Sequence, residues 1–467
     1  MGQHANVKAE IAALIARKDL AALKKFVEPW LAADLAPVIA DLSVEELAAL
    51  FRVCPRELAA ATFTYLPHDS QWKLLKALNQ EQTAALLNAL PPDDRTAFLN
   101  ELPLDVAMQL LGMLTPDERQ VAQSLLAYPE HSVGRMMTLD YVAVHPEWTV
   151  RQSLDFIREH GYDRETLNVV FVVDDEGRLI DDVRVRRFLL SPLDRPVREL
   201  LDGNYTMLTP TDDREKALGL FKQFDRVALP VVDENKKLIG IVTVDDMLDV
   251  AEAEATEDIQ KMGGSEALDE PYISISLPKM VKKRASWLVI LFLSEMLTTT
   301  AMTTFQAEID KATVLSLFLP LILSSGGNSG SQGSTLVIRA LALGEFKLRE
   351  WWKVMRRELV AGFSLGAILG SIGYLRIAIW SGYYSLRHET NPYGGAHWPL
   401  IALTVSTSVV GTVLWGSLMG TMLPLVIKKA GFDPAASSAP FVATLVDVTG
   451  VIIYFTVAYL VLHGTLL

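Results

Sequence analysis

The sequence predicts a multi-domain membrane protein in which soluble domains precede a bundle of transmembrane helices. Three patterns support this fold class: a 12-residue repeat between residues 42 and 126, two later strand–turn–strand units, and long apolar runs near the C-terminus. The expected parts are an all-α solenoid over residues 1–130, an α/β domain pair over 131–256, a connecting helix over 257–284 and a five-helix α transmembrane domain over 285–467.

Charge divides the chain near residue 276. Residues 1–276 contain 28 Lys+Arg and 47 Asp+Glu, a net charge of −19, whereas residues 277–467 contain 15 and 9, a net charge of +6. A nucleic acid needs a positively charged surface, so the acidic part argues against a nucleic-acid partner. Carboxylate oxygens suit hard divalent cations, although an acidic surface also serves solubility alone.

Several absences narrow the function further. Met1 to Leu20 has no apolar stretch of the kind found in signal peptides, so we expect the soluble domains in the cytosol. Cys54 is the single cysteine, which excludes internal disulfides and thiolate metal clusters. The eight histidines show no nucleophile–base spacing, so we do not expect an enzyme.

The repeat begins a new unit every 12 residues, as at Leu90-Pro91 and Leu114-Thr115, and acidic residues follow most starts. Proline and acidic side chains are typical of the first turn of a helix. Each unit is therefore predicted to be one short helix, and the helices to stack into a solenoid. The acids at these starts, among them Asp69, Asp93 and Asp94, either cap helices or bind cations.

Residues 131–256 contain two similar halves. The first has a helix at 149–160, strands at 169–173 and 179–180 and an acidic turn between them; the second has a helix at 214–224 and strands at 228–232 and 238–243. Apolar strands that alternate with helices predict small buried sheets. The layout resembles a pair of CBS domains, although Asp181-Asp182 stands where glycine is usual.

Thr243 and Asp246 have the Ser/Thr-x-x-Asp spacing with which CBS domains often hold the ribose of an adenine nucleotide. ATP is thus one candidate ligand, although the same spacing forms an ordinary helix N-cap. An acidic helix follows. On it Glu254 and Asp258 lie four residues apart, where like charges repel unless a cation or a basic partner lies between them.

Apolar segments of about 20 residues are long enough to cross a bilayer as helices. Five such spans are predicted, at about 286–305, 314–343, 359–381, 400–427 and 438–462. Basic clusters lie before the first, between the second and third, and after the fourth. The positive-inside rule then puts the N-terminus in the cytosol and the C-terminus outside the cell (inner) membrane. An odd number of spans favours a homodimer.

The second span contains a polar, glycine-rich run from Ser324 to Gly333, and the last span carries one acid, Asp447. We expect the run to break its helix and to line a water-filled cavity; close packing through small residues is the alternative. A carboxylate inside the membrane is costly unless it faces protein, water or a cation. Carbonyl oxygens and one carboxylate suit a hydrated Mg²⁺, without excluding Ca²⁺, Mn²⁺ or a proton-coupled solute.

Three groups of residues are more distinctive than any single motif. They are Gly326-Gly327-Asn328-Ser329-Gly330-Ser331-Gln332 with Thr335 and Arg339-Ala340-Leu341-Ala342; Asp433-Pro434-Ala435 with Pro440-Phe441-Val442-Ala443-Thr444 and Asp447-Val448-Thr449-Gly450; and Glu252-Ala253-Glu254-Ala255-Thr256-Glu257-Asp258-Ile259. Together they resemble the MgtE family of magnesium channels and transporters, over nearly the whole chain. Ala439 and Ser331 depart from the family, in which amide side chains occur at these positions, and Glu295 stands in the first span where a neutral residue is expected.

The resemblance implies a homodimer with the pore on its two-fold axis. Asp447 of each subunit would hold a hydrated Mg²⁺, and the backbone carbonyls of Ser324, Gly327 and Ala443, beside Asn328, would contact the water shell of the ion. Intracellular Mg²⁺ would bind the acidic cytosolic domains and hold the connecting helix as a plug under the pore. The implied sensor residues are Asp245, Asp246, Asp249, Glu254, Glu257 and Asp258, with Asp69, Asp93 and Asp94 of the solenoid opposite.

Two other function classes stay open from the residues alone. One is a nucleotide-regulated, proton-coupled secondary transporter that uses Asp447 and Glu295. The other is a membrane-anchored scaffold in which the solenoid binds partners. An intramembrane acid and a polar run are poor features for a mere anchor.

Overall fold

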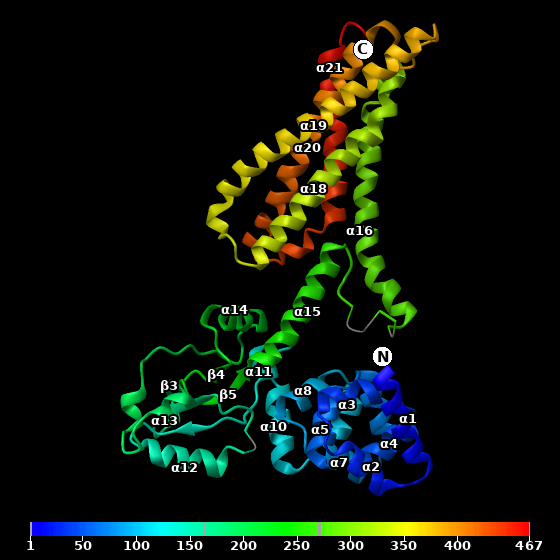
Figure 1. Cartoon of the computed structure of the whole chain (residues 1–467). Helices are drawn as coiled ribbons and strands as arrows, with labels where there is room; N and C mark the ends of the chain where they lie inside the picture. The colour runs from blue at the N-terminus through cyan, green and yellow to red at the C-terminus, as the bar shows by residue number, and fades with distance from the viewer. Residues whose placement is uncertain (1, 163, 269–271, 274, 467) are drawn as a thin grey trace. The chain divides into compact units, whose positions relative to one another are not determined.

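The computed structural model describes residues 2–162, 164–268, 272–273 and 275–466. The chain divides into two compact units, Met1–Glu252 and Ala253–Leu467. Figure 1 shows the short helices of the first unit in blue to green and the long helices of the second in green to red.

The first unit begins with short helices packed on one another. They are α1 Gly2–Ala16, α2 Leu20–Val27, α3 Ala32–Ile39, α4 Val44–Val53, α5 Arg56–Thr64, α6 His68–Ala77, α7 Gln80–Leu87, α8 Pro92–Asn100, α9 Leu104–Leu111 and α10 Pro116–Leu126. From α4 to α10 a new helix begins every 12 residues, which confirms the predicted period. Ser43 and Asn79 form capping boxes, and Leu66, Leu90 and Leu114, each just before an N-cap, are buried.

Strands and helices alternate in the rest of the first unit. Its elements are α11 Val133–Met136, β1 Ala143–Val144, α12 Val150–His160, β2 Val169–Val173, β3 Leu179–Arg184, α13 Val185–Leu190, η1 Val197–Leu200, α14 Arg214–Phe224, β4 Ala228–Val232, β5 Leu238–Thr243 and α15 Val244–Met262. In one sheet β2 pairs with β1 in parallel and with β3 antiparallel; in the other β4 and β5 are antiparallel. Strands β2 and β4 are buried along their whole length, as the apolar runs predicted.

Long helices dominate the second unit. Its elements after α15 are α16 Leu277–Thr304, α17 Gln306–Lys311, η2 Thr313–Phe318, α18 Leu319–Ala342, η3 Leu348–Glu350, α19 Trp351–Leu386, η4 Gly395–His397, α20 Trp398–Lys429, η5 Pro434–Ala436 and α21 Ala439–Leu462. Helix α20 packs against α18, α19 and α21, and α21 also packs against α16. Among the described residues, four helical segments are long and apolar enough to cross a membrane: Leu277–Thr304, Leu348–Leu386, Gly395–Lys429 and Ala439–Leu462.

Helix α18 corresponds to the second predicted span. Its 24 residues are enough to cross a bilayer, but its glycine, serine and amide residues keep it out of the apolar set. The count of five spans therefore stays a prediction.

The separate connecting helix expected over residues 257–284 is not formed as one element. Helix α15 ends at Met262, and Gly264 has a positive φ of 77° with its N–H bonded to the carbonyl of Lys261, a helix-ending geometry. Helix α16 begins at Leu277, with Pro278 in its first turn. The basic residues up to Arg284 thus belong to the first turns of α16, while residues 269–271 and 274 lie outside the described part of the chain.

Candidate functional site

The glycine-rich run of α18 is helical from end to end, so the predicted break is wrong. The alternative, close packing through small residues, accounts for it. A Cβ at Gly416 of α20 would lie 2.2 Å from the carbonyl oxygen of Gly326, and one at Gly420 would lie 2.0 Å from that of Gly330. Two helices whose backbones come this close need glycine on both sides.

Asp447 lies on α21 beside the same run. A Cβ at Gly327 would be 3.4 Å from the Cβ of Ala443 and 3.6 Å from Oδ1 of Asp447. The Asp447 side chain is partly buried and makes no hydrogen bond or ion pair with any described residue. The carboxylate of Glu295 on α16 is near enough for the two charges to repel, and no Glu295–Arg339 ion pair forms among the described residues. Asp447 therefore has a second acid nearby and, in the part of the chain that the structure describes, no cation paired with it.

The polar residues and the glycines of α18 lie on different faces of the helix. Ser324, Asn328 and Gln332 lie four residues apart on an exposed face, while Gly326 and Gly330 are buried. Asn328 Nδ2 donates to Ser324 Oγ over 3.3 Å. The structure thus brings Gly327, Ala443 and Asp447 together and places Ser324 and Asn328 on the neighbouring polar face.

Serines of α18 anchor the start of α21. Ser331 Oγ donates to the carbonyl of Ala439 over 3.0 Å, and Ser334 Oγ donates to that of Ser437 over 2.9 Å. The two positions that depart from the family, Ser331 and Ala439, are therefore partners. Their bond joins a side-chain hydroxyl to a backbone oxygen, so it needs no amide side chain at either position.

In the first unit, an acidic cluster forms where the first turns of α8 and α15 come together. It consists of Asp93, Asp94, Asp245, Asp246 and Asp249, with Glu165 from the loop before β2. Burial and the neighbouring carboxylates raise the pKa of Asp94 to about 6 and that of Asp246 to about 7. Desolvation and the charge of Asp246 raise the pKa of Asp93 well above its usual value.

One carboxylate oxygen of this cluster has no partner. Asp93 is 8% exposed, and its Oδ1 is buried without a hydrogen bond. Nevertheless, among the described residues, no group of three or more His, Cys, Asp or Glu side chains is arranged to hold a metal ion. The cluster therefore concentrates charge without presenting a finished coordination shell.

The remaining predicted sensor residues lie elsewhere. Asp69 is exposed at the start of α6 and pairs with Lys73 over 3.2 Å. Glu254, Glu257 and Asp258 belong to the second unit, where Glu257 pairs with Lys261 over 2.6 Å. Burial, Asp433 and Glu254 raise the pKa of Asp258. The residues predicted as one sensor are thus divided between the two units.

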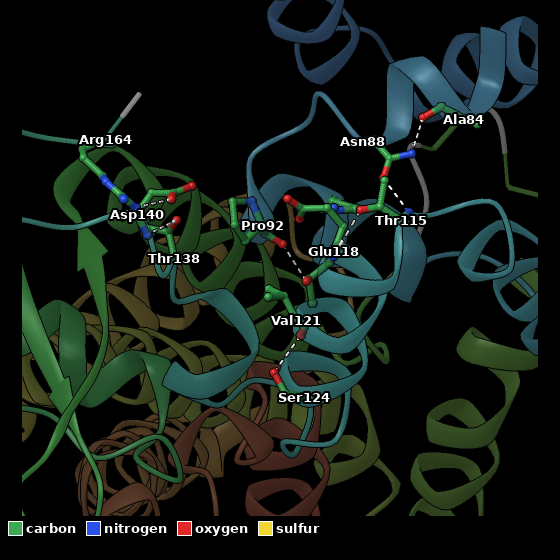
Figure 2. Close-up of polar contacts among 12 residues, drawn as sticks. Ala84, Asn88, Pro92, Thr115, Glu118, Val121, Ser124, Thr138, Asp140 and Arg164 are labelled. Carbon is green, nitrogen blue, oxygen red and sulfur yellow. Dashed lines mark hydrogen bonds and ion pairs between the residues drawn. The ribbon is translucent and has the colours of Figure 1, made fainter. Parts of the chain in front are cut away.

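The sequence reasoning missed Glu165 and Asp140, which lie in loops next to the solenoid. Burial and acidic neighbours raise the pKa of Glu165, and Asp140 Oδ1 accepts from Arg164 Nη1 over 2.9 Å (Figure 2). Both residues lie in loops, where the sequence has no helix or strand periodicity that would identify them as candidates. The acids adjoin a polar cavity of about 350 Å³ lined in part by Pro92 and Arg95.

Polar contacts connect residues in the walls of this cavity. Arg95 is 1% exposed, and its Nη2 lies 2.5 Å from Glu118 Oε2, while its Nε and Nη1 have no partner. Asn88 joins α7 to α10, because its Nδ2 donates to the carbonyl of Ala84 and its Oδ1 accepts from the Thr115 N–H (Figure 2). The solenoid side of the cavity is therefore a fixed frame.

Thr243 and Asp246, the residues predicted to bind a nucleotide, form a hydrogen bond with each other. Thr243 Oγ1 donates to Asp246 Oδ2 over 2.9 Å, and Asp246 belongs to the acidic cluster, which would repel phosphate. A different cavity of about 300 Å³ in the α/β part is basic. It is lined by Asp182, Arg184, Arg186, Arg187, Asp202, Asn204, Phe224 and Arg226. Asp182 pairs with Arg226 over 2.8 Å, and its other oxygen is buried without a partner.

Family comparisons cover most of the chain. The family model described as divalent cation transporter matches residues 319–457, the MgtE intracellular N domain matches 31–131, and CBS domains match 133–190 and 197–253. The magnesium transporter MgtE of Thermus thermophilus is 37% identical over 75% of this chain and 75% of its own length. That of Bacillus subtilis is 28% identical over 74% of this chain and 73% of its own length.

Solved structures resemble the cytosolic part. The soluble part of a magnesium transporter is 22% identical and has a TM-score of 0.52, covering 54% of this chain and 99% of that one, which supports the fold alone. The cytosolic domain of the Mg²⁺ channel MgtE in complex with ATP is 30% identical with a TM-score of 0.49, covering 52% and 99%. By its sequence relatives and family models, the chain belongs to the MgtE family of magnesium transporters, which are transport proteins and not enzymes.

Proposed function

We propose that this transporter conducts Mg²⁺ through a pore in which Asp447 of each subunit of a homodimer holds the hydrated ion. The observation that carries the proposal is Asp447 itself: a partly buried carboxylate with no protein partner, next to Gly327 and a polar helix face. Two such acids on a dimer axis would repel, and a hydrated divalent cation between them relieves the repulsion. Wide spacing through a water shell suits Mg²⁺, which gives up its waters reluctantly.

The same proposal gives the neighbouring groups their roles. Water molecules on the ion contact the oxygens of Ser324, Gly327 and Ala443, whose carbonyls keep a free lone pair while bonded within their helices. Asn328 extends the polar lining. With cytosolic N-terminal and CBS domains, five spans would put the C-terminus outside the cell.

Mg²⁺ uptake into proteoliposomes tests the pore role. Asp447→Ala removes the charge that attracts the ion, so we expect uptake to fall by at least about tenfold, equivalent to about 1.4 kcal/mol. Glu308→Gln, which removes an acid of α17 outside the helix bundle, is the matched control and should leave uptake unchanged. Equal uptake by the Asp447→Ala variant and the unaltered protein would contradict the proposal.

A proton-coupled transporter is the second candidate, because the interacting charges of Glu295 and Asp447 could share a proton. Unlike a channel, a proton-coupled transporter would need a proton gradient for Mg²⁺ uptake. Uptake that proceeds at equal pH on both sides excludes it, whereas uptake that requires a proton gradient and is lost in Glu295→Gln supports it.

The acidic cytosolic cluster is the proposed sensor that closes the pore when intracellular Mg²⁺ is high. Asp93, Asp94, Asp245, Asp246 and Asp249 with Glu165 concentrate charge at α8 and α15, and the unpartnered Asp93 oxygen offers a ligand. A cation shared between α8 and α15 would lower their repulsion and favour the arrangement in which they are close. We do not include Glu254, Glu257 and Asp258 in this sensor, because they lie on the part of α15 that belongs to the second unit.

For ATP, the arginine-lined cavity fits better than the pair Thr243 and Asp246. Arg184 and Arg186 form no hydrogen bond or ion pair with described residues and would face phosphates, while Asp182 offers a free oxygen to a ribose hydroxyl. Calorimetric titration of the full chain with ATP tests this. Arg184→Gln with Arg186→Gln should weaken binding, whereas Arg178→Gln, an exposed arginine in the β2–β3 turn, should not. Weaker binding in Asp246→Asn alone would instead favour the pair that the sequence predicted.

A further inference from the structure

A groove of about 580 Å³ follows the first turns of α19 in the membrane unit. It is lined by Lys353, Arg356, Arg357, Val360 and Ala361. Residues 353, 356 or 357, and 360 share one face of a helix, because they lie three to four positions apart. The groove therefore has a cationic end at the helix start and an apolar end further along.

The three cations at this end have fewer anionic partners than positive charges among the described residues. Lys353 Nζ lies 2.7 Å from Glu350 Oε1. Arg356 and Arg357 are exposed, and their side chains form no hydrogen bond or ion pair with residues that the structure describes. Lys353 lies in the first turn of α19, where the helix dipole favours anions and disfavours cations. An anion bound here would relieve both unfavourable terms.

The residues around the groove are of the kind found at the depth of lipid headgroups. Trp351 and Trp352 form an edge-on pair with ring centroids 5.8 Å apart and are both about half exposed. Exposed tryptophans at the end of an apolar helix are typical of the membrane–water interface. Val360 and Phe363, 66% and 59% exposed, continue the apolar side deeper into the segment Leu348–Leu386.

We propose that this groove binds an anionic phospholipid of the cytosolic leaflet, with the lipid phosphate on Arg356, Arg357 and Lys353 and an acyl chain along Val360. A free phosphate would use only the cationic end, whereas a lipid uses both. Arginine suits the phosphate because its planar N–H fork binds two oxygens at once. The cytosolic side rests on the proposed topology, in which the N-terminal domain is intracellular and α16 and α18 both cross the membrane before α19 begins.

Native mass spectrometry of the full-length protein with phosphatidylglycerol or phosphatidylcholine tests the proposal. Arg356→Gln with Arg357→Gln should weaken phosphatidylglycerol binding by about 10- to 30-fold, given about 1 kcal/mol for each basic residue near an anionic membrane surface. Lys428→Gln with Lys429→Gln, which removes two exposed charges at the end of α20, is the matched control and should have little effect. Arg356→Lys with Arg357→Lys should retain much of the binding, which separates lost charge from misfolding.

Three results would overturn the proposal. Equal loss in the two charge-removing pairs would mean a diffuse surface potential and no defined groove. Displacement of phosphatidylglycerol by millimolar inorganic phosphate would identify a soluble anion as the ligand. A change in oligomeric state on size-exclusion chromatography in Arg356→Gln with Arg357→Gln, without a change in lipid binding, would show that a second copy of the chain covers the groove.

Discussion

Ionising the carboxyl groups of Asp94 and Asp246 costs more free energy in the folded chain than in the unfolded chain. Their pKa values, raised to about 6 and about 7 by burial and neighbouring acids, exceed those of an unfolded chain. The folded state therefore binds more protons at pH 4–7, and its stability is lost as the pH rises through this window. Without Mg²⁺, we expect the free energy of unfolding to fall between pH 5.5 and 7.5, by on the order of 2–3 kcal/mol.

Thermal unfolding of the full chain at several pH values measures this loss. Asp246→Asn should flatten the pH dependence, whereas Asp105→Asn, at an exposed position of the solenoid, should leave it unchanged. Millimolar Mg²⁺ should also flatten it, since a cation stabilises the charged carboxylates. A stability that rises over this pH range without Mg²⁺ would contradict the assignment.

Single residues differ in how far the sequence predicts their role. Asp93 and Asp246 stand at helix starts, so pattern and composition mark both as candidates. Glu165 lies in a loop, where no periodicity signals its approach to them. Asp69 matches the same helix-start pattern as Asp93 but faces solvent with Lys73, because equivalent repeat positions point in different directions along a solenoid.

At the scale of elements, the crossing of α18 and α20 depends on backbone contact. A Cβ at Gly420 would lie 2.0 Å from the Gly330 carbonyl, so Gly420→Ala forces the helices apart. We expect a loss of about 2 kcal/mol or more in the stability of the membrane unit, of the size seen for overpacked cores. Gly382→Ala on α19 is the control, because its Cβ would meet nothing within 4 Å.

Thermal unfolding of both variants in detergent, followed by the monodisperse fraction, measures this difference. Equal losses would show that α18 and α20 do not depend on the close approach at Gly330. A preserved melting temperature with reduced Mg²⁺ uptake would instead place the role of Gly420 in conduction.

The elements themselves were largely predictable, and their contacts were not. The 12-residue period located the starts of α4 to α10, because each start carries its own local capping signals. The glycine run of α18 was expected to break the helix because its partner glycines, Gly416 and Gly420, lie some 90 residues later in the sequence. Only their apposition shows that the run packs tightly and stays helical.

At the scale of the whole molecule, α15 carries acidic residues at its start and a basic residue at its end. Its first turns carry Asp245 and Asp246 of the acidic cluster, and its last turn carries Lys261. Lys261 Nζ lies 2.6 Å from Glu257 and 2.7 Å from Asp433, whose other oxygen caps η5 just before α21. These carboxylates raise the pKa of Lys261, so it stays charged at any physiological pH.

In the proposed gating, a cation bound at the start of α15 would act along this helix on the entrance of α21, the helix that carries Asp447. We expect Lys261→Gln to raise the Mg²⁺ concentration that half-inhibits uptake by about 5- to 30-fold, the range for two partly exposed ion pairs of about 0.5–1 kcal/mol each. Mg²⁺ binding to the acidic cluster should be unchanged, because Lys261 is not part of it. Lys73→Gln, which breaks the Lys73–Asp69 pair within one solenoid helix, is the matched control and should alter neither quantity. If Lys261→Gln lowers Mg²⁺ binding and inhibition together, then Lys261 acts on the sensor itself; if it changes neither, the Lys261–Asp433 pair does not transmit the signal.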